Sequence, residues 1–427
     1  MKVLLVNSFN YMRGGGERCF FDHSALLRSH GHEVIPFTMD HPDNLTSEYS
    51  EYFVSYIDYP TELGKPGLGP KLKVLERVLY SREAKHNLES LLAETQPDLV
   101  HIHGFIHEMS TSILPALKAA GLPVIQTLHD YKIACPNTTF VSHDRICEAC
   151  KGGKYFNMTR YRCKRGSLSA SLLATVEMYF HDVFRLYEPN VDLFISPSEF
   201  LREKLIEHGL RKPVIVIPNF IYPDHFQPVY EAGNHFVFAG RLVRPKGILT
   251  LLEAMRRVDT RAILTIAGSG ELETQIRQFI RDHDLTNVQL AGHLSTPDLI
   301  RLIQQAIFTV VPSEWYENYS MSVIESLACG TPVIGSRIGG IPEQVEDGLN
   351  GLLFESGNAS ELAEKIQFLV DNREQAIEMG RRGRRRIESV NSPQAHYEQL
   401  YPAYDRLLRG LPAGQTETQS GPVVEAV

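Results

Sequence analysis

The feature that most constrains the fold of this chain is an alternation of short apolar runs with helical patterns, which occurs twice. In the first half the runs are residues 3–6, 33–38, 98–103, 124–128 and 193–196. In the second half they are residues 236–239, 263–267, 288–291, 308–311, 333–335 and 352–354. Because strands that alternate with helices build parallel sheets, the sequence predicts an α/β protein with two doubly wound, Rossmann-like domains that face each other across a cleft.

The expected domains follow from these two series of strands. We predict a first domain over residues 1–200, with a cysteine-rich insertion at 135–165, and a second domain over 201–392. After a break at Asn391-Ser392-Pro393, a final helix is predicted within residues 393–410. The tail at 411–427 is rich in Pro, Gly, Gln, Thr and Ser, so we expect it to be disordered.

Composition excludes several classes of protein. The net charge is −8, from 43 basic and 51 acidic residues, so the whole molecule offers no electrostatic footprint for nucleic acid. No segment reaches the roughly 18 apolar residues of a membrane span, and the run at 3–6 is too short for a signal-peptide core. We therefore expect a cytoplasmic protein.

Three consecutive glycines, Gly14, Gly15 and Gly16, lie between the first apolar run and the first helical pattern. Glycine lets a backbone turn tightly and approach a phosphate, whose charge a helix N-terminus favours. The sequence thus predicts a loop that faces phosphate. The alternative is an ordinary loop in which Glu17 complements the helix dipole.

A basic loop, residues 240–247, joins the first strand and the first helix of the second domain. Arg241 can hold two phosphate oxygens in a fork, and Lys246 adds a positive charge at the start of the helix. This pair suits a diphosphate. A solvated basic loop is the alternative interpretation.

The segment from Glu314 to Glu325 follows the strand at 308–311. Ser322 and Glu325 have the spacing of a helix capping box, whereas nothing structural explains Glu317. In the cleft, Glu317 could reach a polar substrate and Glu325 could accept from a ribose-type diol. We also expect free N–H groups facing an anion, from Asn318, Tyr319, Ser320, Met321 and Ser322. A nucleotide sugar fits this arrangement.

Histidines follow two strands of the first domain. His129 comes directly after the run at 124–128, which places it at the cleft edge of the sheet, and a turn histidine bonded to backbone is the alternative. His101 and His103 occupy a similar position, and the alternation of side chains along a strand sends both to one face.

Several of these motifs occur together in an order that resembles a known family. They are Gly15-Gly16-Glu17, Gly240-Arg241 with Lys246-Gly247, Ala267-Gly268-Ser269-Gly270-Glu271-Leu272, Glu317-x7-Glu325, Ala328-Cys329-Gly330-Thr331-Pro332-Val333-Ile334 and Gly339-Gly340-Ile341-Pro342-Glu343. The chain resembles retaining glycosyltransferases of the GT-B fold, of the family 4-like, group 1 type.

The resemblance implies roles for individual residues. In such enzymes the residues that match Arg241 and Lys246 bind the donor diphosphate, and the one that matches Glu325 binds the ribose. Those that match Glu317 and His129 contact the transferring sugar and are the catalytic candidates. The glycine loop closes over the phosphates from the first, acceptor-side domain, to which the last helix returns.

The resemblance also implies a reaction. We expect transfer of a sugar from a nucleotide-diphosphate sugar to a glycan or lipid-linked acceptor, with retention, in polysaccharide or glycoconjugate biosynthesis. The only D-x-D triplet, at residues 282–284, does not follow a nucleotide-binding strand, so we expect no metal or other cofactor in catalysis. A nucleotide-sugar epimerase of the same fold and a noncatalytic nucleotide-sugar binding protein are the alternatives.

Four of the six cysteines are close together, at Cys135, Cys147, Cys150 and Cys163. They supply four soft ligands, one pair in C-x2-C spacing, and a reducing cytosol favours metal over disulfides. Structural zinc is the leading interpretation, followed by an iron–sulfur cluster; free thiols and disulfides are the alternatives.

Basic and apolar residues alternate in two segments of the first domain. One is residues 65–85, and the other carries Arg145, Lys151, Lys154, Arg160, Arg162, Lys164 and Arg165 with interleaved aromatic residues. Such a surface could meet anionic lipid, which would make the protein peripheral at the inner membrane face. A solvated face is the alternative, and we expect no nucleic acid partner.

Overall fold

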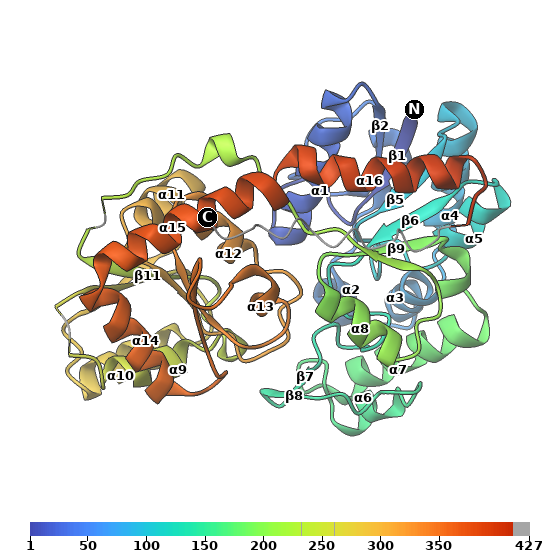
Figure 1. Cartoon of the computed structure of the whole chain (residues 1–427). Helices are drawn as coiled ribbons and strands as arrows, with labels where there is room; N and C mark the ends of the chain where they lie inside the picture. Colours follow the sequence, from blue (N-terminus) through green and yellow to red (C-terminus); the bar gives the residue numbers. More distant parts are fainter. Residues whose placement is uncertain (232, 260, 413–427) are drawn as a thin grey trace.

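The computed structural model describes residues 1–231, 233–259 and 261–412, which form two α/β lobes (Figure 1). Most of the tail expected to be disordered, residues 413–427, lies outside the described residues. No helix among the described residues has the length and apolarity that a membrane span requires.

The first lobe is built on a six-stranded sheet in which every neighbouring pair is parallel. Its spatial order is β10 (Val214–Val216), β9 (Leu193–Ser196), β6 (Val124–Thr127), β5 (Leu99–Ile102), β1 (Lys2–Val6) and β2 (Glu33–Phe37). Nearly all residues of these strands are buried, as in parallel sheets covered by helices on both faces.

The second lobe repeats this design with another all-parallel sheet of six strands. Its order is β13 (Val288–Gly292), β12 (Ile263–Ala267), β11 (His235–Ala239), β14 (Thr309–Val311), β15 (Val333–Ser336) and β16 (Gly351–Phe354). The strands lie within one or two residues of the predicted apolar runs. Five of the six are largely buried, whereas the edge strand β13 is half exposed.

Helices cover both sheets (Figure 1). Those of the first lobe are α1 (Gly15–Ser29), α2 (Tyr59–Gly64), α3 (Gly69–Leu79), α4 (Arg82–Thr95), α5 (Ile113–Ala119), α6 (Phe156–Arg160), α7 (Leu168–Val183) and α8 (Glu199–Glu207). Those of the second are α9 (Ile248–Met255), α10 (Glu273–Asp282), α11 (Thr296–Gln304), α12 (Met321–Ala328), α13 (Ile341–Gln344), α14 (Ala359–Asp371) and α15 (Arg373–Val390). Two short pairs, β3 (Met39–Asp40) with β4 (Val54–Ser55) and β7 (Val141–Ser142) with β8 (Arg145–Ile146), lie outside the main sheets.

The boundary predicted at residue 200 is wrong, because the first lobe continues beyond it. Leu201 and Leu205 of α8 are fully buried in the core of the first lobe, and Val214–Val216 pairs with β9. The chain therefore leaves the first sheet only after residue 216.

The last helix, α16 (Pro393–Leu408), returns to the first lobe. Leu400 and Tyr404 are fully buried in one core cluster with Val3 and Leu5 of β1. In Figure 1, α15 lies over the second lobe and α16 over the first. The C-terminal end of the described chain thus closes the first lobe.

Candidate functional site

The loops after β11 and β14 touch each other at the carboxyl edge of the second sheet. Gly247 has φ of +68°, and a Cβ placed on it would lie 1.7 Å from the carbonyl oxygen of Pro312. Such an approach requires glycine. It brings the turn at Arg244–Lys246 against the segment that carries Glu317.

Glu317 lies in a buried polar site. Its Oε1 accepts hydrogen bonds from Lys246 Nζ at 2.6 Å, from Ser313 Oγ at 2.7 Å and from Trp315 Nε1 at 2.7 Å. Burial raises the pKa of Glu317, but the Lys246 charge and the three donors outweigh burial, so the pKa is below its ordinary value. The side chain is therefore an ionised carboxylate with a fixed orientation.

A cavity of about 400 Å³ opens beside this site, between the lobes. From the second lobe it is lined by Arg241, Glu271 and Trp315. Trp315 also packs beside Lys246, with the ammonium 5.4 Å from the ring centroid. The first lobe supplies the opposite wall from the cysteine-rich insertion, including Tyr161 and Arg162. Cations and aromatic rings thus face a space large enough for a small ligand.

The glycine loop of the first lobe faces the N-terminus of α12. A Cβ placed on Gly15 would lie 3.7 Å from Met321 Cγ, the first residue of that helix. One turn further, Arg18 donates to Glu325 Oε1 at 2.5 Å. Burial raises the pKa of Glu325, and the Arg18 charge opposes this effect. An ion pair therefore joins the two lobes at the position expected to meet a ribose.

Two expectations about the start of α12 are wrong. The helix begins after Ser320, so Ser322 is its second residue and forms no capping box with Glu325. The N–H of Ser320 is not free, because it donates to Gln344 Oε1 at 2.8 Å. The side chain of Tyr319 is also engaged, as its hydroxyl accepts from Asn391 Nδ2 at 2.7 Å.

Asn318 connects this segment to His129. Its Nδ2 donates to the backbone carbonyl of His129 at 2.6 Å, across the gap between the lobes. Its Oδ1 is buried and has no hydrogen-bond partner among the described residues. The structure therefore brings His129, Asn318 and the Glu317 segment together.

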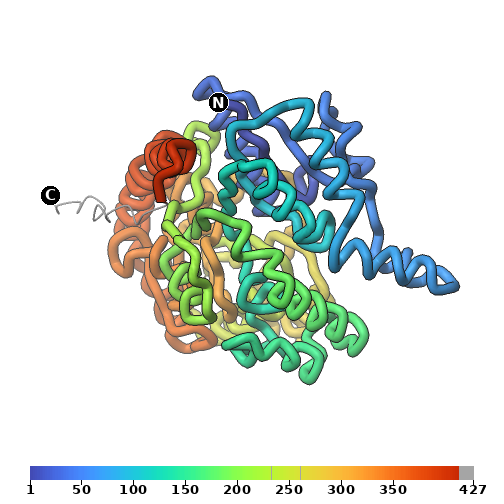
Figure 2. The backbone as a smooth tube through the Cα atoms, turned by 90° about the vertical axis from the view of Figure 1, so that its right-hand side faces the viewer, coloured from blue at the N-terminus to red at the C-terminus, as the bar shows by residue number. Residues whose placement is uncertain are grey.

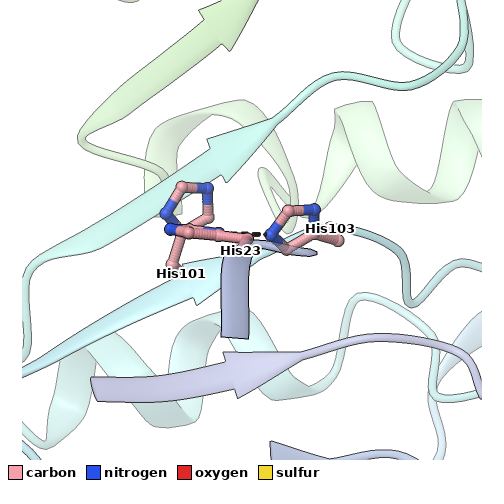
Figure 3. Close-up of side chains that lie close together, drawn as sticks. All are labelled: His23, His101 and His103. Atoms are coloured by element: carbon pink, nitrogen blue, oxygen red, sulfur yellow. Dashed lines mark hydrogen bonds between the residues drawn. The ribbon is translucent and has the colours of Figure 1, made fainter. Parts of the chain in front are cut away.

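His129 is the end of a continuous chain of hydrogen bonds through the first lobe. The bonds join His129 Nε2 to His103 Nδ1 (2.9 Å), His103 Nε2 to His23 Nδ1 (2.7 Å), His23 Nε2 to the Tyr404 hydroxyl (3.2 Å), that hydroxyl to His101 Nδ1 (2.5 Å), and His101 Nε2 to Thr127 Oγ1 (2.7 Å). Figure 3 shows the three central histidines. The hydrogen-bond chain passes through Tyr404 of α16, the helix that returns from the second lobe, and ends at Thr127 of β6.

The histidines of this chain are held neutral. Burial lowers the pKa of His129 to about 4, and burial together with the neighbouring histidines lowers the pKa of His23, His101 and His103. A neutral imidazole donates from one nitrogen and accepts at the other, so the proton positions along the chain are linked. The hydrogen-bond chain therefore determines whether Nδ1 of His129 offers a proton or a lone pair.

The same three central histidines are the one group in the described chain that brings three candidate metal-ligand atoms within 4.8 Å of one another. The rings of His101 and His103 are stacked, with centroids 5.0 Å apart and planes 15° apart. Both ring nitrogens of all three histidines already take part in the hydrogen-bond chain. The arrangement fits a hydrogen-bond chain better than a metal site.

Family models match nearly the whole described chain. The model for Glycosyltransferase Family 4 matches residues 13–225, and the model for Glycosyl transferases group 1 matches residues 224–386. The chain belongs to the group 1 glycosyl transferases. The second match contains the loops of Lys246, Glu317 and Glu325, and the first contains the glycine loop and His129.

Relatives and solved structures agree with this assignment. An uncharacterized glycosyltransferase of Methanocaldococcus jannaschii is 33% identical over 47% of this chain and 56% of its own length, so the match spans little more than half of that relative. Sucrose-phosphate synthase of Thermosynechococcus elongatus is 20% identical and superposes over 96% of this chain and 99% of its own, with a TM-score of 0.67. Anabaena HepE in complex with UDP-glucose, 18% identical, covers 96% and 100%, with a TM-score of 0.62. The expected GT-B fold is confirmed.

Among the site residues expected of this glycosyltransferase, the structure groups Lys246 with Glu317, Gly15 with Met321, and Asn318 with His129. Arg241 does not contact Glu317 but lies on the wall of the adjoining cavity. Gly16 is next to Gly15 in the first turn of α1.

Sequence reasoning missed Trp315, His23 and Tyr404 as parts of this region. Trp315 could have been found, because it is the only tryptophan and lies two residues before Glu317. His23 and Tyr404 are 381 residues apart, and no local pattern connects them.

The hydrogen-bond chain leads to a prediction about His129. The change Tyr404→Phe removes the hydroxyl that joins His23 to His101. Tyr404 then no longer determines which ring nitrogens of His23, His103 and His129 carry a proton. We expect changed imidazole ¹⁵N shifts at His103 and His129 in histidine-labelled protein. Tyr397→Phe is the matched control, since the Tyr397 hydroxyl on the same helix bonds His32, outside the chain, at 2.7 Å. Equal spectra for wild type and Tyr404→Phe would disprove the connection.

Proposed function

We propose that this glycosyltransferase moves a sugar from a nucleotide-diphosphate sugar to a glycan or lipid-linked acceptor, with retention of the anomeric configuration. The observation that carries the proposal is the Lys246–Glu317 pair beside Trp315 at the cavity between the lobes, opposite the glycine loop. HepE, which shares the fold, was solved with UDP-glucose, and this supports a nucleotide-sugar donor.

In the proposed reaction the bond between the anomeric carbon and the diphosphate oxygen breaks, and a bond to the acceptor oxygen forms. The acceptor proton passes to the leaving diphosphate, so the products are a glycosylated acceptor and a nucleoside diphosphate. Negative charge grows on the leaving group as the bond breaks. Lys246, Arg241 and the N-terminus of α12 would stabilise that charge, and such preorganised groups usually make the largest contribution to catalysis.

Glu317 and His129 have different parts in this proposal. Glu317 keeps Lys246 in place and presents a carboxylate beside the cavity, where it can accept from a sugar hydroxyl. His129 offers Nδ1 to the transferring sugar, since that nitrogen has no partner in the described part of the chain and its other nitrogen is held by His103. Glu325 would exchange Arg18 for the ribose hydroxyls.

Two measurements test the proposal. A panel of UDP, GDP, ADP and TDP sugars should contain one that raises the unfolding midpoint, because a ligand that binds only the folded state stabilises it. Labelled sugar from that donor should then reach an added glycan or lipid-linked acceptor. Glu317→Ala should lose most of the transfer and keep the midpoint shift. A donor that binds without transfer to any acceptor would favour a sensor, and an isomerised donor would favour an epimerase.

We also propose that the insertion at 135–165 holds a structural zinc. Amide groups of Asn137, Thr139 and Phe140 hydrogen-bond the Cys135 sulfur, as around metal thiolates, and they oppose the rise in its pKa that burial causes. Residues 145–165 carry seven basic side chains, which favour a negatively charged metal–thiolate group. No three of the four sulfur atoms lie within 4.8 Å of one another in the described chain, so binding would draw the insertion together.

Metal content tests this assignment. Protein purified without chelator should contain about one zinc per chain, and Cys147→Ser should lower that content. Cys329→Ser is the control, because Cys329 is buried in the second lobe far along the sequence from the insertion. Protein with neither zinc nor iron would disprove the metal site, and iron would point to the second interpretation.

A further inference from the structure

Helix α7 exposes a row of apolar side chains. Leu168, Leu172, Val176 and Val183 follow one another at intervals of four, four and seven residues, and their exposed fractions range from 42% to 73%. The opposite face buries Glu177, whose Oε2 accepts from Lys132 Nζ at 2.7 Å. The buried face also holds Ala174 and Met178, so α7 carries apolar side chains on both faces, and a helix of this kind is normally covered on both.

The two helices that pack against α7 also expose apolar side chains. α3 packs on α7 through Val74, Val78 and Leu173. Leu72 of α3 is 60% exposed, and Leu68, which directly precedes the helix, is 75% exposed. α6 exposes 52% of Phe156. In Figure 2 the blue segment that contains α2 and α3 projects from the first lobe. Half of the large apolar side chains exposed by the described residues, 11 of 22, belong to α2, α3, α6, α7 and their ends.

We call the surface formed by Leu68, Leu72, Phe156, Leu168, Leu172 and Val183 the apolar surface. Because α3 and α6 both pack against α7, these exposed side chains lie on neighbouring helices, and such clusters of exposed apolar side chains mark an interaction site. Cations are close to these residues along the chain: Lys71 precedes Leu72, and Lys154 and Arg160 lie two residues before and four residues after Phe156. These three cations are exposed and form no ion pair among the described residues. Apolar side chains with unpaired cations close to them complement the anionic headgroups and acyl chains of a lipid bilayer.

We propose that the apolar surface docks on an anionic phospholipid membrane. The leucines of α3 and α7 would enter the boundary between headgroups and acyl chains, and the cations would meet the lipid phosphates. Tyr161 and Arg162, which line the cavity between the lobes, lie between α6 and α7. Docking would therefore hold the cavity close to the membrane. This inference does not depend on the proposed reaction, because the surface is separate from the Lys246–Glu317 site.

Vesicle sedimentation of the full-length protein tests the proposal. The protein should sediment with phosphatidylcholine vesicles that contain phosphatidylglycerol, more weakly with phosphatidylcholine alone, and less at high salt. The double variant Leu172→Ser/Val183→Ser should bind the anionic vesicles at least about tenfold more weakly, because the buried apolar area falls. Phe368→Ser/Leu408→Ser is the control, since these two side chains are each 40% exposed outside the apolar surface.

Three results would overturn the proposal. The first is no sedimentation with anionic vesicles, and the second is equal binding by wild type and the Leu172→Ser/Val183→Ser variant. The third is a wild-type dimer in solution that becomes monomeric in this variant but not in the control variant, which would show that a second copy covers the surface. The far-ultraviolet spectrum and the donor-induced midpoint shift should be the same in all variants. A failure of docking therefore stays distinguishable from a failure of the proposed reaction.

Discussion

Replacing Lys246 by methionine is expected to lower kcat by about 10²–10³, the loss typical of removing one preorganised group that stabilises developing charge. Methionine keeps the length of the side chain and its packing beside Trp315 but removes the ammonium, which donates to Glu317 at 2.6 Å. Binding of the donor should weaken less than kcat, because the charge on the leaving group is largest in the transition state.

The same variant has a second consequence, for Glu317. Without the ammonium, burial acts on the carboxylate with less opposition, so the pKa of Glu317 should rise and the protein should lose about 1–3 kcal/mol of stability at neutral pH. The sign follows from linkage: the present, lowered pKa contributes stability above the unfolded-state pKa of Glu, and that contribution disappears as pH falls. In the variant, the loss of folding stability that accompanies protonation of Glu317 as pH falls should be smaller.

A matched control separates these effects from a general loss of surface charge. Arg256 directly follows α9, the helix that starts after Lys246, and its one ion pair among the described residues is an exposed pair with Glu253. Arg256→Met should leave kcat unchanged and alter stability by less than about 1 kcal/mol. Steady-state kinetics and urea denaturation of both variants give the comparison. A kcat for Lys246→Met within about threefold of wild type would remove Lys246 from the proposed mechanism.

The fold could be predicted from the sequence because strand patterns in parallel sheets are local. Most strands in the two large sheets are short apolar runs that both helical layers bury, and the pattern is present in the residues themselves. The predicted boundary at residue 200 was wrong because it depends on non-local pairing. Whether Val214–Val216 belongs to the first or the second sheet is decided by its pairing with β9, which no local pattern encodes.

The candidate site divides in the same way. Glycines of the motifs could be located from the sequence, and the structure explains Gly339 as it does Gly247: Gly339 has φ of +59°, and a Cβ there would lie 2.4 Å from the carbonyl oxygen of Glu317. The neighbouring Gly340 N–H donates to the same oxygen at 2.7 Å. By contrast, the start of α12 is fixed by Gln344, which lies 24 residues beyond Ser320, so the spacing of Ser322 and Glu325 was misleading.

Gly247→Ala is expected to destabilise the protein by more than about 3 kcal/mol and to lower activity further than stability alone explains. The added methyl would lie 1.7 Å from the carbonyl oxygen of Pro312 and 2.7 Å from its carbonyl carbon, both backbone atoms that cannot rotate away. Either the Arg244–Lys246 turn or the segment leading to Glu317 must move. In both cases Lys246 loses its position relative to Glu317, and small displacements of this kind are costly for catalysis.

Gly357→Ala isolates the contribution of the contact, because Gly357 also has a positive φ, +80°, but nothing lies within 4 Å of a Cβ placed there. That variant should show only the cost of a left-handed conformation, about 1–2 kcal/mol. The difference between the two variants in urea denaturation therefore measures the close approach of the two loops. If both lose the same stability and both keep wild-type kcat, the packing of Gly247 against Pro312 does not position Lys246, and the proposed site would have to be held together by the Glu317 hydrogen bonds alone.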